Sequence, residues 1–203
     1  MVKFAAKELR LSEPTKSELA KIKRRNIYIV CDNVLDTYNI GSIFRLADAV
    51  GARCVYLCGE SETPPNPRIE KASVGTYKWV RWEYASTAVE AVKSLKLKVK
   101  NLKIVAIEQD ERAVDFRKVD YARPVAFVVG HETNGVSEEA LAVCDEIVEI
   151  PMFGVNISLN VMVSLAIIIY RAFRAWLHTA TNVPWKISRL ICACQWKRRK
   201  KPY

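Results

Sequence analysis

Two short apolar runs, 125–129 and 146–150, constrain the fold of this chain most strongly. Both are rich in β-branched residues, both end at a turn with glycine or proline, and a helix-length apolar segment follows at 158–171. Runs of this kind are typical of strands buried on both faces of a parallel sheet. Because α/β proteins bind ligands in the loops at the carboxyl ends of such strands, the polar and glycine residues there are candidate site residues. They are Gly130, Glu132, Asn134, Gly135, Gly154, Asn156, Ser158 and Asn160.

The rest of the chain alternates in the same way. We expect further strands at 26–31, 53–58, 79–84 and 103–108, and helices at 40–50, 86–97 and 138–143. This order predicts an α/β fold with a parallel sheet flanked by helices. The segment from Ser158 to Ile169 is apolar on nearly all sides, so we expect a helix buried between other elements. Three prolines in 61–67 exclude regular structure there, and 185–196 is a candidate last helix.

Size and composition suit one domain with short appendages. The chain has 203 residues, half of them hydrophobic, which allows a sizeable core. No stretch reaches the roughly 18–20 apolar residues that span a bilayer. The first ten residues lack the apolar core of a secretory signal, so a cytoplasmic protein is expected. We divide the chain into a basic N-terminal helical extension (1–25), a central domain (26–178) and a basic C-terminal extension (179–203).

The positive charge is concentrated at the two ends. The net charge is +10; residues 1–25 hold eight Lys/Arg and three acids, residues 179–203 hold seven Lys/Arg and no acid, and the middle holds 17 and 19. A near-neutral body with basic ends favours nucleic acid or another polyanion as partner, because a few neutralised phosphates give a large affinity. The alternative is that the basic ends only keep the protein in solution.

Several common sites are not predicted. The six cysteines include no C-x-x-C pair, which favours free thiols over disulfides or a metal site. The segment from Gly130 to Gly135 is followed by Val136 and Ser137, where a P-loop has Lys and then Ser or Thr. Neither the dinucleotide fingerprint G-x-G-x-x-G nor the hydrolase elbow G-x-S-x-G occurs.

Three separate segments together resemble a known family. They read D-N-V-L-D-T-Y-N-I-G-S-I-F-R, V-V-G-H-E-T-N-G-V-S and I-P-M-F-G-V-N-I-S-L-N-V-M-V-S-L-A. In order and spacing they are similar to the three motifs of the SpoU (TrmH-type) RNA 2′-O-ribose methyltransferases, over about 26–174. The resemblance implies the SPOUT fold with a C-terminal trefoil knot, S-adenosylmethionine (SAM) as methyl donor, RNA as substrate, no metal, and a homodimer with each site near the subunit interface.

The resemblance also implies roles for individual residues. Those expected to bind the cofactor are Val129, Gly130, Glu132, Ile150, Met152, Asn156, Ser158 and Leu159. Those expected to act in catalysis are Arg45, Glu132, Ser158 and Asn160. Those expected to bind substrate are Asn33, Asn39 and Arg45. For Asn156 and Asn160, helix N-capping is an alternative.

Arg45 is expected to reach the ribose hydroxyl from the partner subunit. A ribose hydroxyl is a weak nucleophile and needs a proton acceptor or a strong orienting contact. An ordinary arginine cannot accept a proton. Either the pKa of Arg45 is strongly depressed in the site, or Arg45 positions a substrate phosphate that accepts the proton.

The compact catalytic domain with short basic ends favours tRNA over rRNA as substrate. Two alternatives stay open: a SPOUT methyltransferase that modifies a base, and a non-catalytic RNA-binding protein on the same scaffold. The ribose-methylation motifs argue against the first. The presence of Arg45, Glu132 and Asn160 argues against the second.

Removal of residues 197–203, which include five Lys/Arg, is expected to weaken RNA binding and to flatten its salt dependence. Each lost phosphate contact lowers the slope of log K against log[salt] by roughly 0.7–0.9. Anisotropy titrations at several KCl concentrations measure the slope, and removal of the uncharged 202–203 alone is the control. An unchanged slope would mean that the tail serves solubility only.

Overall fold

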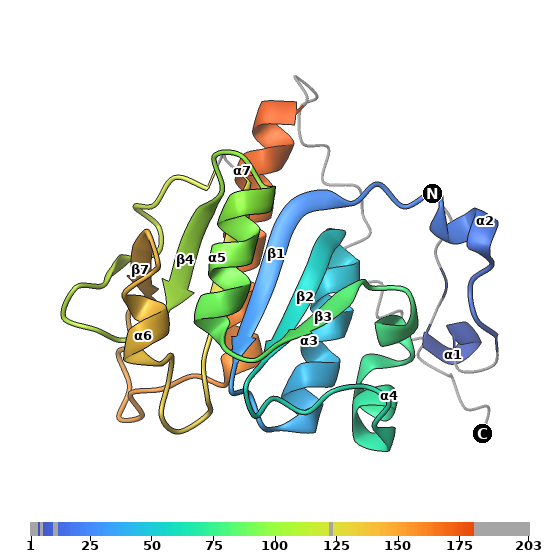
Figure 1. Ribbon diagram of the computed structural model, residues 1–203, viewed down its shortest axis with the longest axis horizontal. Helices are drawn as coiled ribbons and strands as arrows, with labels where there is room; N and C mark the ends of the chain where they lie inside the picture. Colours follow the sequence, from blue (N-terminus) through green and yellow to red (C-terminus); the bar gives the residue numbers. More distant parts are fainter. Residues whose placement is uncertain (1–3, 5, 10–11, 122–123, 181–203) are drawn as a thin grey trace, which may run out of the picture.

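A computed structural model describes residues 4, 6–9, 12–121 and 124–180 of the chain (Figure 1). Its centre is a seven-stranded sheet in which each described strand pair is parallel. The elements are α1 (Ala6–Leu9), α2 (Lys16–Leu19), β1 (Arg25–Asp32), α3 (Thr37–Val50), β2 (Ala52–Cys58), α4 (Pro67–Ser73), the 3₁₀ helix η1 (Thr76–Lys78), β3 (Trp82–Ala85), α5 (Ala88–Lys98), β4 (Lys103–Ile107), β5 (Val114–Asp115), β6 (Val125–Val129), α6 (Glu138–Leu141), β7 (Glu146–Glu149) and α7 (Val161–Ala180).

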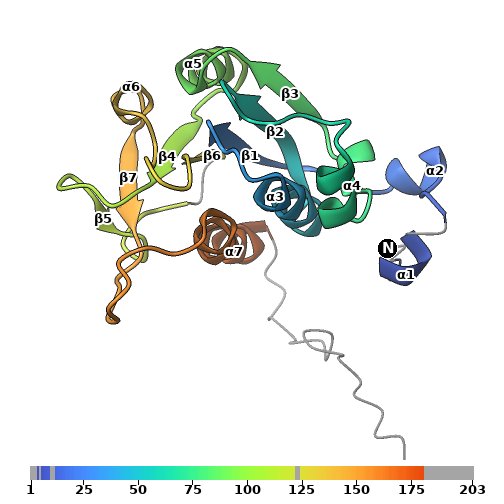
Figure 2. The ribbon, with the colours of Figure 1, turned by 90° about the horizontal axis from the view of Figure 1, so that it is seen from below.

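The fold has three layers. The strand order is β3-β2-β1-β6-β4-β7-β5. Helices α5 and α6 cover one face of the sheet, and α3, α4 and α7 cover the other (Figure 2). The predicted parallel α/β sheet flanked by helices is therefore confirmed.

Strand β1 shows how one sequence serves both layers. Ile27, Ile29 and Cys31 belong to the core shared with α3 and α7, whereas Tyr28 and Val30 belong to the core under α5. Successive side chains of a strand point to opposite faces, so a strand covered on both faces must be apolar throughout. The same holds for the neighbouring strand β6, which is buried along its whole length.

The helices begin at positions set by capping side chains. Helix α3 starts at Thr37, earlier than predicted, because the Asp36 side chain accepts a hydrogen bond from Tyr38 N at 2.8 Å. Helix α5 is capped by Thr87, whose hydroxyl accepts from Glu90 N at 3.1 Å. Ser86, just before this cap, bonds the Glu90 carboxylate through its side chain.

Helix α4 is not predicted from the sequence. Asn66 caps it by accepting hydrogen bonds from Arg68 N and Ile69 N, and Pro67 occupies its first turn, where a missing N–H does no harm. The proline-rich segment is thus a loop that runs directly into a helix. Helix α4 packs closely on α3, and the contact leaves room only for glycine at position 41.

Helix α7 begins at Val161, three residues later than predicted, because Asn160 accepts hydrogen bonds from Met162 N and Val163 N. The prediction that it is buried on nearly all sides is wrong. Val163, Ile167 and Tyr170 are exposed, and their spacing of four and three residues places them on one face of the helix. We call these three residues the α7 stripe.

The N-terminal extension contacts the domain through an ion pair. Glu13 accepts a hydrogen bond from the Lys78 ammonium at 2.6 Å, beside the end of η1. In both ribbon views α1 and α2 lie on the same side of the molecule as α4 (Figures 1 and 2). Within the described part of this extension, α1 and α2 are two short helical stretches of four residues each.

The described cysteines are free thiols, as predicted. Burial raises the pKa of the Cys54 and Cys58 thiols to about 12, so they serve as small apolar residues. Cys192 and Cys194, the candidate helix 185–196 and most of the C-terminal extension lie outside the described residues. Within the described part of the chain no helix is long and apolar enough to cross a membrane.

Substitution Gly41→Val is expected to destabilise the fold by about 2–3 kcal/mol, because added atoms overpack the α3–α4 contact. A Cβ at this position would lie 2.5 Å from Ala72 Cβ and 2.9 Å from the Ile69 carbonyl oxygen. Gly154→Val is the matched control, since a Cβ there meets nothing within 4 Å. Urea unfolding measures both; equal midpoints for the two variants would contradict the packing argument.

Candidate functional site

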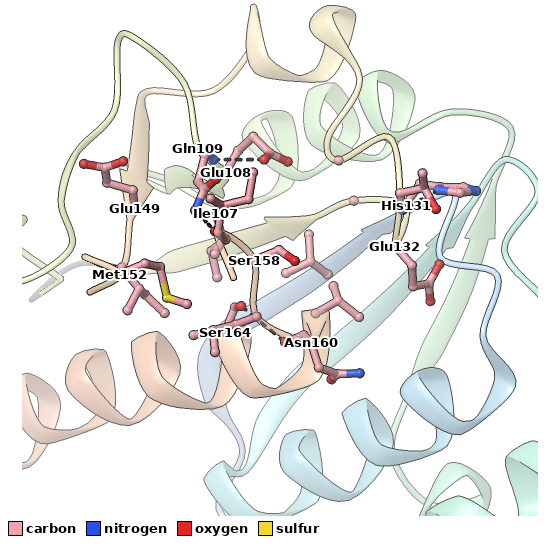
Figure 3. Close-up of a pocket in the computed structure, with 18 of the residues that line it drawn as sticks. Ile107, Glu108, Gln109, His131, Glu132, Glu149, Met152, Ser158, Asn160 and Ser164 are labelled. Carbon is pink, nitrogen blue, oxygen red and sulfur yellow. Dashed lines mark hydrogen bonds between the residues drawn. The ribbon is translucent and has the colours of Figure 1, made fainter. Parts of the chain in front are cut away.

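A cavity of about 450 Å³ lies at the carboxyl ends of β4, β6 and β7 (Figure 3). Its walls come from 107–109 after β4, 129–135 after β6, 148–160 after β7, and the first turn of α7. The volume lies within the roughly 300–1,000 Å³ that is typical of small-molecule sites. Parallel α/β sheets bind ligands at this edge, because the strand ends present loops there.

The structure brings most of the predicted site residues to this cavity. The cavity-lining set includes each of the expected cofactor-binding residues and the catalytic candidate Asn160. Five predicted residues do not line it. They are Asn33, Asn39, Arg45, Asn134 and Gly154.

A chain of hydrogen bonds joins the three motifs at the edge of the cavity. Asn39 Nδ2 donates to Glu132 Oε1 at 2.9 Å. Asn160 Nδ2 donates to Asn39 Oδ1 at 2.9 Å. Asn39 is only 6% exposed, and both ends of its amide are used in these two bonds. We call Glu132, Asn39 and Asn160 the motif network.

Glu132 also holds the N-terminus of α3. Its carboxylate oxygens accept hydrogen bonds from Leu35 N at 3.2 Å and Asp36 N at 3.0 Å. Burial alone would raise the pKa of the Glu132 carboxyl, but the hydrogen bonds from Asn39, Asp36 and Leu35 outweigh it and hold the pKa below its usual value near 4.5. Glu132 is therefore ionised at neutral pH.

Asn33 serves the loop after β1. Its backbone is left-handed, with φ of 55°, which asparagine tolerates better than most residues. Its Oδ1 accepts from Glu60 N at 2.9 Å, and its Nδ2 donates to Asp32 at 2.9 Å. Asp32 in turn accepts from Ser137 N at 2.9 Å and from Ser137 Oγ at 2.6 Å. Sequence reasoning missed Asp32, although a carboxylate at the end of a buried strand is a signal for such a bond.

The second motif is a closed turn. His131 and Gly135 exchange backbone hydrogen bonds of 2.9 Å in both directions. His131 Nδ1 accepts from Thr133 N at 2.9 Å and from Asn134 N at 3.2 Å. A Cβ on Gly130 would lie 2.1 Å from the Gly135 carbonyl, so only glycine fits there.

The third motif leads into α7. Asn156 Oδ1 accepts from Ser158 N at 3.1 Å and from Ser158 Oγ at 3.3 Å. Asn156 therefore forms a turn within the loop and is no helix cap, whereas Asn160 caps α7 and bonds Asn39 at the same time.

The cavity lining combines apolar residues with polar ones, and its charged residues are acidic. The lining includes Glu108, Glu132 and Glu149 and, among the described residues, no Lys or Arg. The apolar part of the lining includes Ile107, Val129, Val148, Ile150, Leu159 and Val161. This combination suits a ligand that has an apolar ring system and a positive charge. Within the described residues there is no group of three side chains that could hold a metal ion.

A fully parallel sheet with a ligand-sized cavity at its carboxyl edge defines an α/β protein of the kind that binds a small cofactor there. The sequence profile of the "SpoU rRNA Methylase family" matches residues 26–170. The chain belongs to this family of RNA methylases, and the predicted family resemblance is confirmed.

Known proteins resemble the chain over most of its length. A tRNA (guanosine(18)-2′-O)-methyltransferase of Aquifex aeolicus is 36% identical over 157 residues, which are 77% of this chain and 73% of that protein. The crystal structure of the A. aeolicus TrmH/SpoU tRNA modifying enzyme superposes with a TM-score of 0.71 at 32% identity, over 86% of this chain and 84% of that one. The SpoU methyltransferase AviRb from Streptomyces viridochromogenes, solved with the cofactor AdoMet, gives 0.69 at 26% identity, over 79% and 65%.

Substitution Glu132→Gln is expected to lower stability at neutral pH, because a charged acceptor of three hydrogen bonds becomes neutral. A depressed pKa stabilises the fold above the ordinary carboxyl pKa, and this contribution is lost as pH falls through the folded value. The stability difference between wild type and variant should therefore shrink below about pH 4.5. Urea unfolding from pH 7 to pH 3 measures it, with exposed Glu139→Gln as control; a pH-independent difference would contradict the assignment.

Proposed function

We propose that this protein transfers a methyl group from SAM to a ribose 2′-hydroxyl of tRNA. The observation that carries the proposal is the motif network, which joins three distant segments around one cavity. The relatives whose names specify tRNA guanosine-2′-O-methyl transfer support tRNA as the RNA and a guanosine as the target. Cytoplasmic location follows from this substrate and is part of the proposal.

The cavity fits SAM. The apolar wall that includes Ile150 and Leu159 suits the adenine ring, and the acidic lining suits a cationic donor. When bound there, SAM supplies an activated methyl group on a sulfonium. Backbone groups of the loops would hold it, and Gly130 and Gly135, which both line the cavity, belong to the closed turn of the second motif.

The catalytic arrangement that we propose needs two subunits. Arg45 is exposed on α3, outside the cavity of its own subunit. Helices α3 and α7 contact each other on the same face of the sheet, and the α7 stripe leaves an apolar surface beside them. A second copy that covers this surface would bring the partner subunit's Arg45 to the cavity. Ribose and phosphate would then lie between one subunit's loops and the other's cation.

In this arrangement Arg45 binds the phosphate next to the target ribose. A guanidinium forks onto phosphate oxygens with two parallel hydrogen bonds, which orients the sugar. Since an ordinary arginine cannot accept a proton, we propose that the phosphate would accept the proton of the 2′-hydroxyl. The new C–O bond would form as the bond between the methyl group and the sulfur of SAM breaks, with S-adenosylhomocysteine as the leaving group. Ser158 and Asn160, exposed at the cavity, are placed to orient the hydroxyl or the donor.

The geometry supports a different role for the other two predicted substrate-binding residues. Asn39 is buried in the motif network, and Asn33 bonds the loops after β1 and β2. We propose that both organise the site and that neither touches RNA. The C-terminal trefoil knot, the catalytic domain at 26–178 and RNA contacts by 1–25 and 179–203 belong to the same proposal, supported by the family resemblance and the charge distribution.

Identification of the methylated nucleoside tests the reaction class. The protein is incubated with labelled SAM and unmodified tRNA, and the RNA is digested to nucleosides for mass spectrometry. We expect 2′-O-methylguanosine. A base-methylated nucleoside would favour the alternative SPOUT activity, and bound SAM without any transfer would favour a binding protein.

Arg45→Ala is expected to lower methyl transfer by about two orders of magnitude or more while SAM affinity stays within about threefold, because the residue contacts substrate and not the cofactor. Single-turnover transfer and calorimetry measure the two quantities. The matched control is Arg53→Ala, which removes an exposed arginine from β2. Full activity of Arg45→Ala would exclude a role for this arginine in the transfer step.

Mixing two inactive variants tests whether the site is shared. Arg45→Ala keeps an intact cavity, and Leu159→Arg places a cation in the cavity but keeps Arg45. If Arg45 acts on the partner's cavity, mixed dimers contain one intact site, and a one-to-one mixture should regain about a quarter of wild-type activity. No recovery in a mixture shown to contain mixed dimers would mean that each subunit uses its own Arg45.

A further inference from the structure

We infer that Glu108 and Gln109, two consecutive residues after β4 that belong to none of the three motifs, are positioning residues for the cofactor. The inference rests on the proposed function, because it assigns these side chains a role in the SAM site. Each of them bonds a different loop of the cavity, and both line the cavity wall (Figure 3).

Glu108 holds the second motif. Its Oε2 accepts a hydrogen bond from Val136 N at 2.8 Å, and its Oε1 accepts from Gln109 N at 2.9 Å. The contact is tight, because a Cβ on Gly135 would lie 2.3 Å from Glu108 Oε2. The carboxylate therefore bonds the backbone directly after the closed turn of 130–135 and holds the end of that turn in place. This turn carries Gly130 and Glu132, two of the expected cofactor contacts.

Gln109 holds the third motif. Its Nε2 donates a hydrogen bond to the Ile157 carbonyl oxygen, one residue before Ser158 (Figure 3). The large apolar residues of the loop around Ile157 are exposed: Phe153 is 96% exposed and Ile157 is 72% exposed. With few apolar contacts, the loop depends on the polar bonds that tie it to the body. Gln109 supplies one at its middle, and Asn160 supplies one at its end.

The two bonds together set the separation of the cavity walls. In extended backbone, consecutive side chains point in opposite directions, so adjacent residues can bond loops on two sides of one strand end. Strand β4 lies between β6 and β7, and these strands lead into the two loops. The residues at the end of β4 thus hold both loops that are expected to bind the cofactor. Loosening either bond should weaken SAM binding and leave transfer from the saturated site unchanged.

Two substitutions separate a hydrogen-bonding role of Glu108 from an electrostatic one. Glu108→Gln keeps an oxygen that can accept from Val136 N but removes the charge, whereas Glu108→Ala removes both. For Gln109, the isosteric Gln109→Glu replaces the donor by a carboxylate that faces the Ile157 carbonyl. Glu111→Gln, an exposed acid in the same loop, is the matched control.

The test is calorimetric titration of each full-length variant with SAM, together with KM for SAM and kcat on tRNA. We expect Glu108→Ala and Gln109→Glu to raise the Kd and KM for SAM about tenfold or more. Glu111→Gln should stay within about threefold, and kcat at saturating SAM should stay within about threefold in each variant. Glu108→Gln, which keeps the bond from Val136 N but loses the charge and the bond from Gln109 N, should raise the Kd less than Glu108→Ala does. Equal losses in Glu108→Gln and Glu108→Ala would point to the charge alone.

Circular dichroism and urea midpoints establish whether each variant folds. If Glu108→Ala does not fold, Gln109→Glu still tests the proposal, because Gln109 is exposed. A wild-type protein that binds SAM, with unchanged affinity in Glu108→Ala and Gln109→Glu, would overturn the positioning role alone. So would a loss of kcat at unchanged Kd. A wild-type protein without SAM affinity would overturn the proposed function itself.

Discussion

The site depends on one carboxylate, that of Glu132, and on the buried amide that faces it. This carboxylate accepts a hydrogen bond from Asn39, which is 93 positions away in sequence. Asn39 in turn accepts a hydrogen bond from Asn160, which is 121 positions away from it. A buried amide is favourable only when both its donor and its acceptor are used, so the motif network fixes the orientation of Asn39. An ionised acceptor strengthens the bond that it receives. Loss of Glu132 or of Asn160 would leave the buried amide of Asn39 without one of its two partners.

The strands and the loops that meet at the cavity are held in place by different interactions. The strands that end at the cavity are buried, whereas the loop between β7 and α7 exposes most of its side chains. Apolar burial therefore cannot hold that loop, and polar bonds to the strand ends must do so. The strand ends are thus fixed in position, and hydrogen bonds from them position the loop residues that would contact a ligand. This division explains why so many site residues bond each other as well as facing the cavity.

Sequence reasoning found the strands, the parallel sheet and the residues that gather at the cavity, because apolar runs and terminal glycines are local signals. It could not find which loop residue bonds which, since that depends on strand order. The first motif taken alone assigns Asn33 and Asn39 to substrate, but their partners, Glu60 and Glu132, come from other loops. The exposed α7 stripe was missed for a related reason. An apolar residue looks the same in sequence whether it packs inside its own subunit or remains on the surface.

The geometry of α3 bears on the proposal that two subunits share the site. An α-helix turns by about 100° per residue, so Arg45, six residues after Asn39, lies about 120° around the helix from it and about 9 Å along it. Asn39 faces Glu132 and Asn160, and Arg45 is exposed to solvent instead. The described cavity lining contains no Lys or Arg, although an RNA phosphate beside it would need a cation. The network that completes the cofactor loops therefore also turns the arginine of the same helix away from them. In the arrangement that we propose, a second subunit supplies the cation for the substrate from the face shared by α3 and the α7 stripe.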